Sequence, residues 1–176
     1  MKKFNKLKII AIVLCVTLLY GCPSPISNVV LKSNKVKIDD DLEGGWDITV
    51  MDEVKTYMEV RKKDDYWAYV KMTFRNLEKK TTETIKCDLT MHYIDGQKYA
   101  CLSGWDEGKK FGDVYAIELK ENTLKVFELS LNSEDKDNLK NTPLKVSEPV
   151  FMSYLKDNKI EKGRATYFYK KYDIDN

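Results

Sequence analysis

The sequence predicts a mostly β protein, a small antiparallel β-barrel of about eight strands with one short helix before the last strand. Apolar and polar residues alternate over several short segments, which is the period of two that a half-buried strand shows. Eleven tyrosines and three tryptophans also favour strands over helices. One stretch near residue 150 instead has helical spacing.

The N-terminus has the parts of an export signal. Residues 1–8 hold four lysines and no acid, and an apolar run follows from Ile9 to Tyr20. A run of about 12 residues is typical of a signal peptide and is too short to span a bilayer. It ends in Leu19-Tyr20-Gly21-Cys22, which resembles the lipobox of bacterial lipoproteins.

This resemblance implies that residues 1–21 are a cleaved signal peptide and that the Cys22 thiol receives a diacylglycerol. The new amine is often acylated as well, for example with palmitate, and two or three acyl chains suffice for stable anchoring. We therefore expect a lipid-anchored protein of the cell envelope, facing the periplasm or the cell surface. A plain secretory signal with a chance cysteine is the alternative.

Residues 22–41 show little periodicity and are predicted to be a tether, followed by a barrel domain over residues 42–176. The alternative for part of the tether is that Val29-Val30-Leu31 docks on the domain. Loss of the four signal lysines leaves 26 basic against 28 acidic residues, a formal charge of −2. No basic patch indicates nucleic acid, and we expect a monomer.

The predicted strands follow one another from the first tryptophan to the C-terminus. Apolar residues recur at every second position in each of them, and Asp95-Gly96 is a strong hairpin signal. The segments are Trp46–Val50, Met58–Val60, Tyr66–Arg75, Ile85–Tyr93, Tyr99–Cys101, Val114–Leu119, Thr123–Leu131 and Arg164–Tyr172.

The predicted helix begins after Ser147, which can cap its first turn, and Pro149 is tolerated at that position. Val150, Phe151 and Tyr154 then share one face with Leu155.

Two cysteines remain once Cys15 leaves with the signal and Cys22 carries the lipid. An even pair in an exported protein favours a disulfide, here between Cys87 and Cys101. A three-residue loop at residues 94–96 would turn both toward the same face. We therefore expect a hairpin loop wider than two residues, with two buried thiols as the alternative.

A second resemblance lies at the start of the barrel domain. Gly44-Gly45-Trp46 resembles the Gly-x-Trp motif of lipocalins, in which the tryptophan closes one end of the barrel beneath an arginine from a late strand. The resemblance implies a barrel-closing pair of Trp46 and Arg164. An ordinary core aromatic is the alternative for Trp46.

No pattern in the sequence indicates catalysis. There is no Gly-x-Ser-x-Gly elbow, no phosphate loop and no paired-histidine helix. His92 has no partner at metal-ligand spacing and is placed on the exposed side of its strand, and Asp135 and Asp137 are assigned to a solvated loop. We expect no enzyme, no cofactor and no metal.

Two functions remain open. The first is a non-enzymatic interaction or structural module of the cell envelope, bound to an envelope protein. The second is a carrier or sensor of a small apolar ligand inside the barrel. Large inward residues such as Met72 and Phe74 favour a filled barrel and hence the first function.

Overall fold

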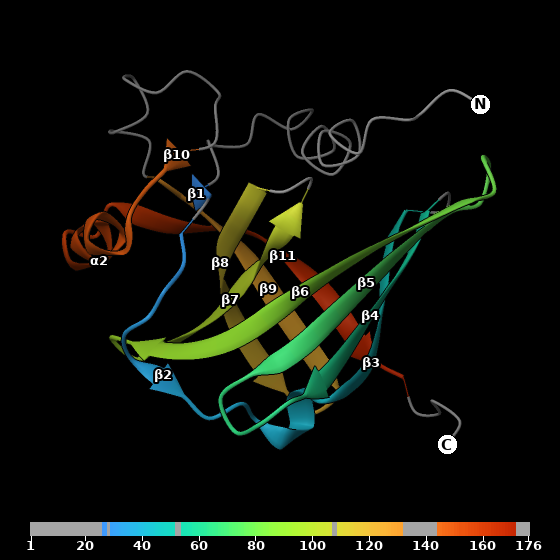
Figure 1. Ribbon diagram of the computed structural model, residues 1–176, viewed down its shortest axis with the longest axis horizontal. Helices are drawn as coiled ribbons and strands as arrows, with labels where there is room; N and C mark the ends of the chain where they lie inside the picture. The colour runs from blue at the N-terminus through green and yellow to red at the C-terminus, as the bar shows by residue number, and fades with distance from the viewer. Residues whose placement is uncertain (1–25, 28, 52–53, 107–108, 132–143, 172–176) are drawn as a thin grey trace.

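The computed structural model of the chain describes residues 26–27, 29–51, 54–106, 109–131 and 144–171. Within these ranges the chain forms a closed barrel of eight antiparallel strands with one α-helix at its side (Figure 1). The predicted fold class is therefore confirmed. The barrel strands are β3 (Gly44–Met51), β4 (Val54–Lys62), β5 (Ala68–Asn76), β6 (Thr81–Ile94), β7 (Gln97–Asp106), β8 (Lys109–Lys120), β9 (Thr123–Leu131) and β11 (Ile160–Lys170).

The strands are paired in chain order around the barrel. The sheet runs β6-β5-β4-β3-β11-β9-β8-β7, and the pairing of β6 with β7 closes it. The helix α2 (Glu148–Lys156) lies between β9 and β11 in the sequence, as predicted. Short elements complete the fold: β1 (Ile26–Ser27), which pairs in parallel with β10 (Leu144–Lys145), β2 (Lys35–Val36), and the 3-10 helix η1 (Asp40–Leu42).

The β6–β7 hairpin differs from its predicted form. Ile94 pairs with Gln97, so the loop is the two-residue Asp95-Gly96. Asp95 (φ 48°) and Gly96 (φ 83°) both have positive φ, which is the conformation of a type I′ turn. That turn matches the twist of the paired strands, whereas the expected three-residue loop shifts the register by one residue.

The register shift separates the two cysteines. Thr90 is the partner of Cys101, so Cys101 shares a face with Thr90 and lies on the opposite face from Cys87. Both are free thiols, and each lies within hydrogen-bonding distance of a carbonyl: Cys87 Sγ is 3.9 Å from Val70 O, and Cys101 Sγ is 3.8 Å from Val29 O. The expected Cys87–Cys101 disulfide is wrong, because a one-residue slip turns every side chain of a strand to the other face.

The barrel wall is buried on both sides over β6 to β9, which gives the protein two cores. The inner core fills one end of the barrel, and the outer core lies between the wall, α2 and the N-terminal segment. In β8, for example, Ile117 belongs to the inner core and Val114 and Ala116 to the outer one. Phe151 of α2 is fully buried and meets the Tyr99 ring edge to face, with ring centroids 6.3 Å apart.

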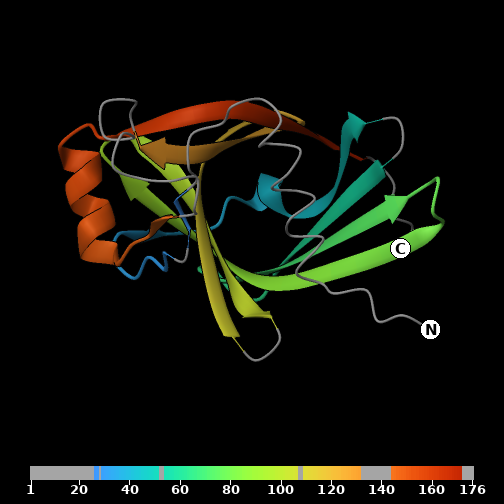
Figure 2. The same cartoon turned by 90° about the horizontal axis from the view of Figure 1, so that it is seen from above.

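The predicted tether is largely part of the folded domain. Val29 (0% exposed) and Leu31 (2%) lie in the outer core, as the docking alternative expected, and Ile38 lies in the inner core. β2 pairs with Met91 and His92, just beyond the last residue of β6 that pairs with β5. The N-terminal segment, residues 29–38, lies at the same side of the barrel as α2 in both views (Figures 1 and 2).

Candidate functional site

One end of the barrel interior is closed by a plug of buried side chains. η1 crosses this end, and the plug includes Leu42, Trp46, Val60, Met91 and Phe168. Trp46 is fully buried, and its indole N–H donates to Leu42 O at 3.0 Å. The tryptophan thus lies fully buried within the plug, and its role in closing the barrel stays a prediction.

The cation beside Trp46 is Lys170. Trp46 pairs with Lys170 across β3 and β11, and the ammonium lies 5.7 Å from the ring centroid while donating to Asp41 O at 2.8 Å. Arg164, the predicted partner, stands earlier on the same strand, about 20 Å away at the rise of a β-strand. Its side chain lies outside the described part of the structure. Sequence spacing missed Lys170 because it compared arginines only.

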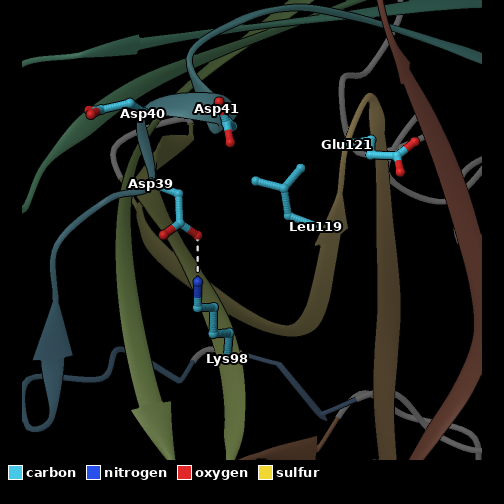
Figure 3. A pocket seen from close by; sticks show the side chains of 6 residues that line it. All are labelled: Asp39, Asp40, Asp41, Lys98, Leu119 and Glu121. Carbon is cyan, nitrogen blue, oxygen red and sulfur yellow. Dashed lines mark hydrogen bonds and ion pairs between the residues drawn. The ribbon is translucent and has the colours of Figure 1, made fainter.

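An acidic pocket of about 460 Å³ lies outside this closed end. Its lining comprises Asp39, Asp40, Asp41, Lys98, Leu119 and Glu121. Figure 3 shows Asp39 directed at Lys98, with 2.6 Å between Oδ2 and Nζ, while Asp40 and Glu121 point away from each other. Among the described residues no group of histidine, cysteine or acidic side chains is arranged to hold a metal ion.

Beyond the plug, the inward-facing side chains become partly exposed. These residues form the distal lumen, and their apolar members are Ile48, Met72, Leu102, Phe111, Tyr115 and Val126. All pack against the inner core yet keep contact with solvent. Solvent therefore reaches the interior of the barrel past the plug, and an eight-stranded barrel of this kind has room for side chains or for one small ligand.

Polar groups face the same space from β8 and β9. Asp113 pairs with the inward-facing Leu102, and Tyr115 with Ala100. On β9, Leu124 and Val126 face inward, so the period of two places Glu128 and Ser130 on the lumen side. Ser130 is 3% exposed, and its hydroxyl has no hydrogen-bond partner.

The charged side chains described in the distal lumen are two partly buried acids, Asp113 and Glu128. Burial raises the pKa of the Glu128 carboxyl. Burial also raises the pKa of the Tyr115 hydroxyl, and the charges of Asp113 and Glu128 raise it further. Tyr115 is thus a neutral hydroxyl close to two carboxyl groups.

The two thiols are unsuited to nucleophilic chemistry at neutral pH. Burial raises the pKa of Cys87 to about 12, with smaller contributions from the charges of Asp88 and Asp113. Burial likewise raises the pKa of Cys101. Each thiol therefore stays protonated, and the thiolate is the reactive form of cysteine.

His92 is buried, contrary to the expected exposed position. The N-terminal segment and α2 cover the outer face of β6. The alternation of apolar and polar residues within β6 gives no sign of this covering. His92 is 0% exposed, with Nδ1 2.6 Å from Ser33 O and Nε2 2.9 Å from Thr90 Oγ1. Both ring nitrogens are engaged within the fold.

In comparisons with known proteins, no family, no curated protein and no solved structure matches this chain. No helix among the described residues is long and apolar enough to cross a membrane. The lipid site Cys22, the signal peptide and the loop with Asp135 and Asp137 lie outside the described residues, so these interpretations stay predictions.

Sequence analysis missed the polar residues of the distal lumen. In β9 the outward positions Phe127, Leu129 and Leu131 are apolar, while the inward positions end in Glu128 and Ser130. In this part of β9 the apolar residues face outward and the polar residues face inward. An assignment that takes the apolar face as the inner face therefore overlooks Glu128 and Ser130. The pattern arises because α2 and the N-terminal segment bury the outer face.

Proposed function

We propose that this protein is a lipid-anchored binding protein of the bacterial cell envelope that carries or senses a small, largely apolar ligand in its barrel. The observation that carries the proposal is the graded interior. A buried plug at the η1 end gives way to apolar side chains that remain in contact with solvent. Binding sites for small molecules are concave and mostly apolar, with a few polar groups that fix orientation.

The lipid anchor and the barrel lumen have separate roles in this proposed function. Acylation of Cys22 holds the domain at a membrane, where apolar molecules concentrate. The barrel shields one such molecule from water. Both described thiols are buried and both ring nitrogens of His92 are engaged within the fold, so we assign none of these three side chains a role in the lumen.

The test uses the uncharged fluorophore N-phenyl-1-naphthylamine, whose emission rises in apolar surroundings. The chain from residue 23 onward is suitable, because both cores lie within residues 29–168. We expect saturable binding that Val126→Trp, which fills the lumen, weakens by about tenfold or more. Lys125→Trp on the outward side of β9 is the matched control. Absence of saturable binding, or equal loss in both variants, contradicts the proposal.

A second function, the interaction module, is favoured by tyrosines on the bare outer face. Tyr69, Tyr167 and Tyr169 are 53%, 45% and 54% exposed, and Lys125 lies over the Tyr167 ring. Exposed aromatic residues are enriched at protein interfaces. A photo-crosslinker at Tyr169 in the native envelope tests this function. One discrete crosslinked partner supports it, whereas the absence of any crosslinked partner contradicts it.

A further inference from the structure

We propose that the bare outer side of β4, β5 and β6 binds an acidic polysaccharide of the cell envelope. This inference goes beyond both proposed functions, because it concerns neither the lumen nor a protein partner. The surface consists of the twelve outward side chains at every second position of residues 55–61, 69–75 and 82–88, which together form the β4–β6 face. The side chains between them, such as Met58 and Val70, point into the inner core.

The β4–β6 face is cationic, although the mature chain is not. It carries five lysines and arginines against two acids, a formal charge of +3, whereas the chain without its predicted signal has a formal charge of −2. Glu59, one of the two acids, already forms an ion pair with Arg61. All five cations are exposed, and α2 lies at the other side of the barrel in both views (Figures 1 and 2). A surface of this kind attracts polyanions.

Two pairs of like charges stand directly opposite each other on this face. Lys71 pairs with Lys86 across β5 and β6, and Lys55 pairs with Arg75 across β4 and β5. Side chains in such positions have Cβ atoms about 5 Å apart, and like charges placed there destabilise a sheet. A polyanion over the two pairs turns this repulsion into attraction. Because the pairs stand about 13 Å apart along β5, they match an extended chain of charges and not one small anion.

The uncharged members of the β4–β6 face are tyrosines and threonines, whose hydroxyl groups can bond to sugar hydroxyls. Tyr69 is 53% exposed, pairs with Arg61 across β4 and β5, and stands two positions from Lys71 on the same face. Lys63 lies over its ring, with Nζ 5.5 Å from the centroid, and adds a further cation at this edge. An aromatic ring among cations suits a polymer in which each charge is attached to a sugar ring.

The composition of the face favours a polysaccharide over other anionic partners. None of the twelve side chains is aliphatic, whereas binding to a lipid surface draws on buried apolar area as well as on charge. Lysine is depleted at the centre of protein interfaces, yet three of the twelve are lysines. The predicted export signal places the domain away from nucleic acid. Acidic polysaccharide is the partner that remains.

The test measures binding of the chain from residue 23 onward to three labelled polymers at low ionic strength, where charges are weakly screened. Polygalacturonate has carboxylates on sugar rings, polyglutamate has carboxylates without sugars, and dextran has sugars without charge. We expect polygalacturonate to bind at least about fivefold more tightly than polyglutamate, and dextran not to bind.

Variants of the face separate the two parts of the recognition. Lys71→Gln combined with Lys86→Gln should weaken polygalacturonate binding about tenfold. The same change should leave the free energy of unfolding unchanged or higher, because it removes a repulsion. Tyr69→Ala should weaken polygalacturonate binding about threefold and leave polyglutamate binding unchanged. Thermal unfolding verifies that each variant is folded.

Lys110→Gln combined with Lys156→Gln is the matched control, because both lysines are exposed, lie on β8 and α2, and change the net charge by the same amount. It should bind polygalacturonate like wild type. No binding of polygalacturonate, equally tight binding of polyglutamate, or an equal loss in the control overturns the inference. Tighter binding to phosphatidylglycerol vesicles or to a single-stranded oligonucleotide also overturns it. N-phenyl-1-naphthylamine binding, which reports on the lumen, should be the same in every variant, so failure here leaves the carrier function standing.

Discussion

His92 is the residue at which the barrel wall, the N-terminal segment and α2 are joined. Its Nδ1 faces a carbonyl, Ser33 O, and therefore carries the proton, so that Nε2 accepts from the Thr90 hydroxyl. The Glu148 carboxylate of α2 accepts three hydrogen bonds from the same segment, from Lys32 N, Ser33 N and Ser33 Oγ. These hydrogen bonds hold the N-terminal segment to the barrel wall and to α2 at two adjacent residues, Lys32 and Ser33.

The same contacts set the charges of both groups. Burial lowers the pKa of His92 most, Lys35 lowers it too, and the bond to Ser33 and the charge of Glu148 offset part of this shift. Burial alone would raise the pKa of Glu148, but the hydrogen bonds from Ser33 and Lys32 outweigh it and the net pKa is lowered. The joint therefore consists of a neutral imidazole and a charged carboxylate at neutral pH.

His92 predicts a loss of stability in weak acid. The unfolded state, with an ordinary histidine pKa near 6.5, takes up a proton before the folded state does. We expect the free energy of unfolding to be level above about pH 6.5 and to fall as the pH drops below it. Chemical denaturation between pH 8 and pH 5 measures the slope. His92→Gln, which keeps a donor for Ser33 O, should flatten it, and an equally steep slope in this variant would sink the assignment.

At the scale of elements, glycines decide how closely segments approach. Gly112 lies on the outer face of β8, where the N-terminal segment crosses. A Cβ at this position would lie 2.4 Å from Val30 Cγ2 and 2.7 Å from Val29 O. The second atom is backbone and cannot rotate away, so the contact requires glycine.

Gly112→Ala is expected to push residues 29–31 off the barrel wall. Overpacking of this kind costs about 1–3 kcal/mol of unfolding free energy. Gly163→Ala, whose nearest contact is 3.3 Å, should cost less. Denaturation curves measure both changes, and limited proteolysis within residues 29–38 detects the displaced segment. A Gly112→Ala protein of wild-type stability and protease resistance would show that the segment does not dock on β8.

Several elements follow from the sequence because their signals are local. Alternation around Met58, Val70 and Leu89 places the inner core, and Phe151 lies on the predicted helix face and is fully buried. The predicted register of the β6–β7 hairpin was wrong by one residue, because the Asp95-Gly96 signal is compatible with both a two-residue and a three-residue loop. That single residue reversed the conclusion about the cysteines.

The candidate site was less accessible to sequence analysis, because its pattern depends on a distant covering. Residues 29–38 and α2 bury the outer face of β6 to β9, which makes outward positions apolar and hides His92. Polar inward positions such as Glu128 and Ser130 then read as solvent-facing. The inner and outer faces of β9 can be told apart only once residues 29–38 and α2 are placed against the barrel wall.

At the scale of the whole molecule, the N-terminal segment is a structural part of the barrel. Val29, Leu31 and Ile38 are each 2% exposed or less, and burial of one such side chain contributes about 1.5–3 kcal/mol. Three of them amount to a large share of the 5–15 kcal/mol that usually stabilises a domain. A domain boundary at residue 42 would remove all three.

Truncation therefore separates two possible starts of the domain. A chain that begins at residue 29 should unfold within about 1 kcal/mol of one that begins at residue 23. A chain that begins at residue 42 should lose about 4 kcal/mol or more, and Gly112→Ala should cost it little, since its clash partners are absent. Circular dichroism during denaturation measures each step. A stable chain from residue 42 would restore the tether interpretation for residues 22–41.

The position of the first buried residue also limits how far the barrel can stand from a membrane. If Cys22 carries the lipid, the seven residues from Cys22 to Asn28 span at most about 25 Å before Val29 enters the outer core. The predicted anchor would thus hold the lumen close to the bilayer surface. This proximity is what a carrier of membrane-soluble ligands needs, and it depends entirely on the Cys22 thiol.

Cys22→Ala is expected to abolish anchoring. Without the thiol no diacylglycerol is attached, and the protein should remain as an uncut precursor or appear in the soluble fraction. Acyl chains contribute about 0.8 kcal/mol for each buried CH₂, so their loss removes the anchor outright. Cys15→Ala, a cysteine of the predicted signal, is the control and should behave like wild type. Fractionation after a carbonate wash, together with gel mobility, gives the answer: a Cys22→Ala protein that stays with membranes at wild-type mobility would refute the lipobox and, with it, the envelope location that the proposed function assumes.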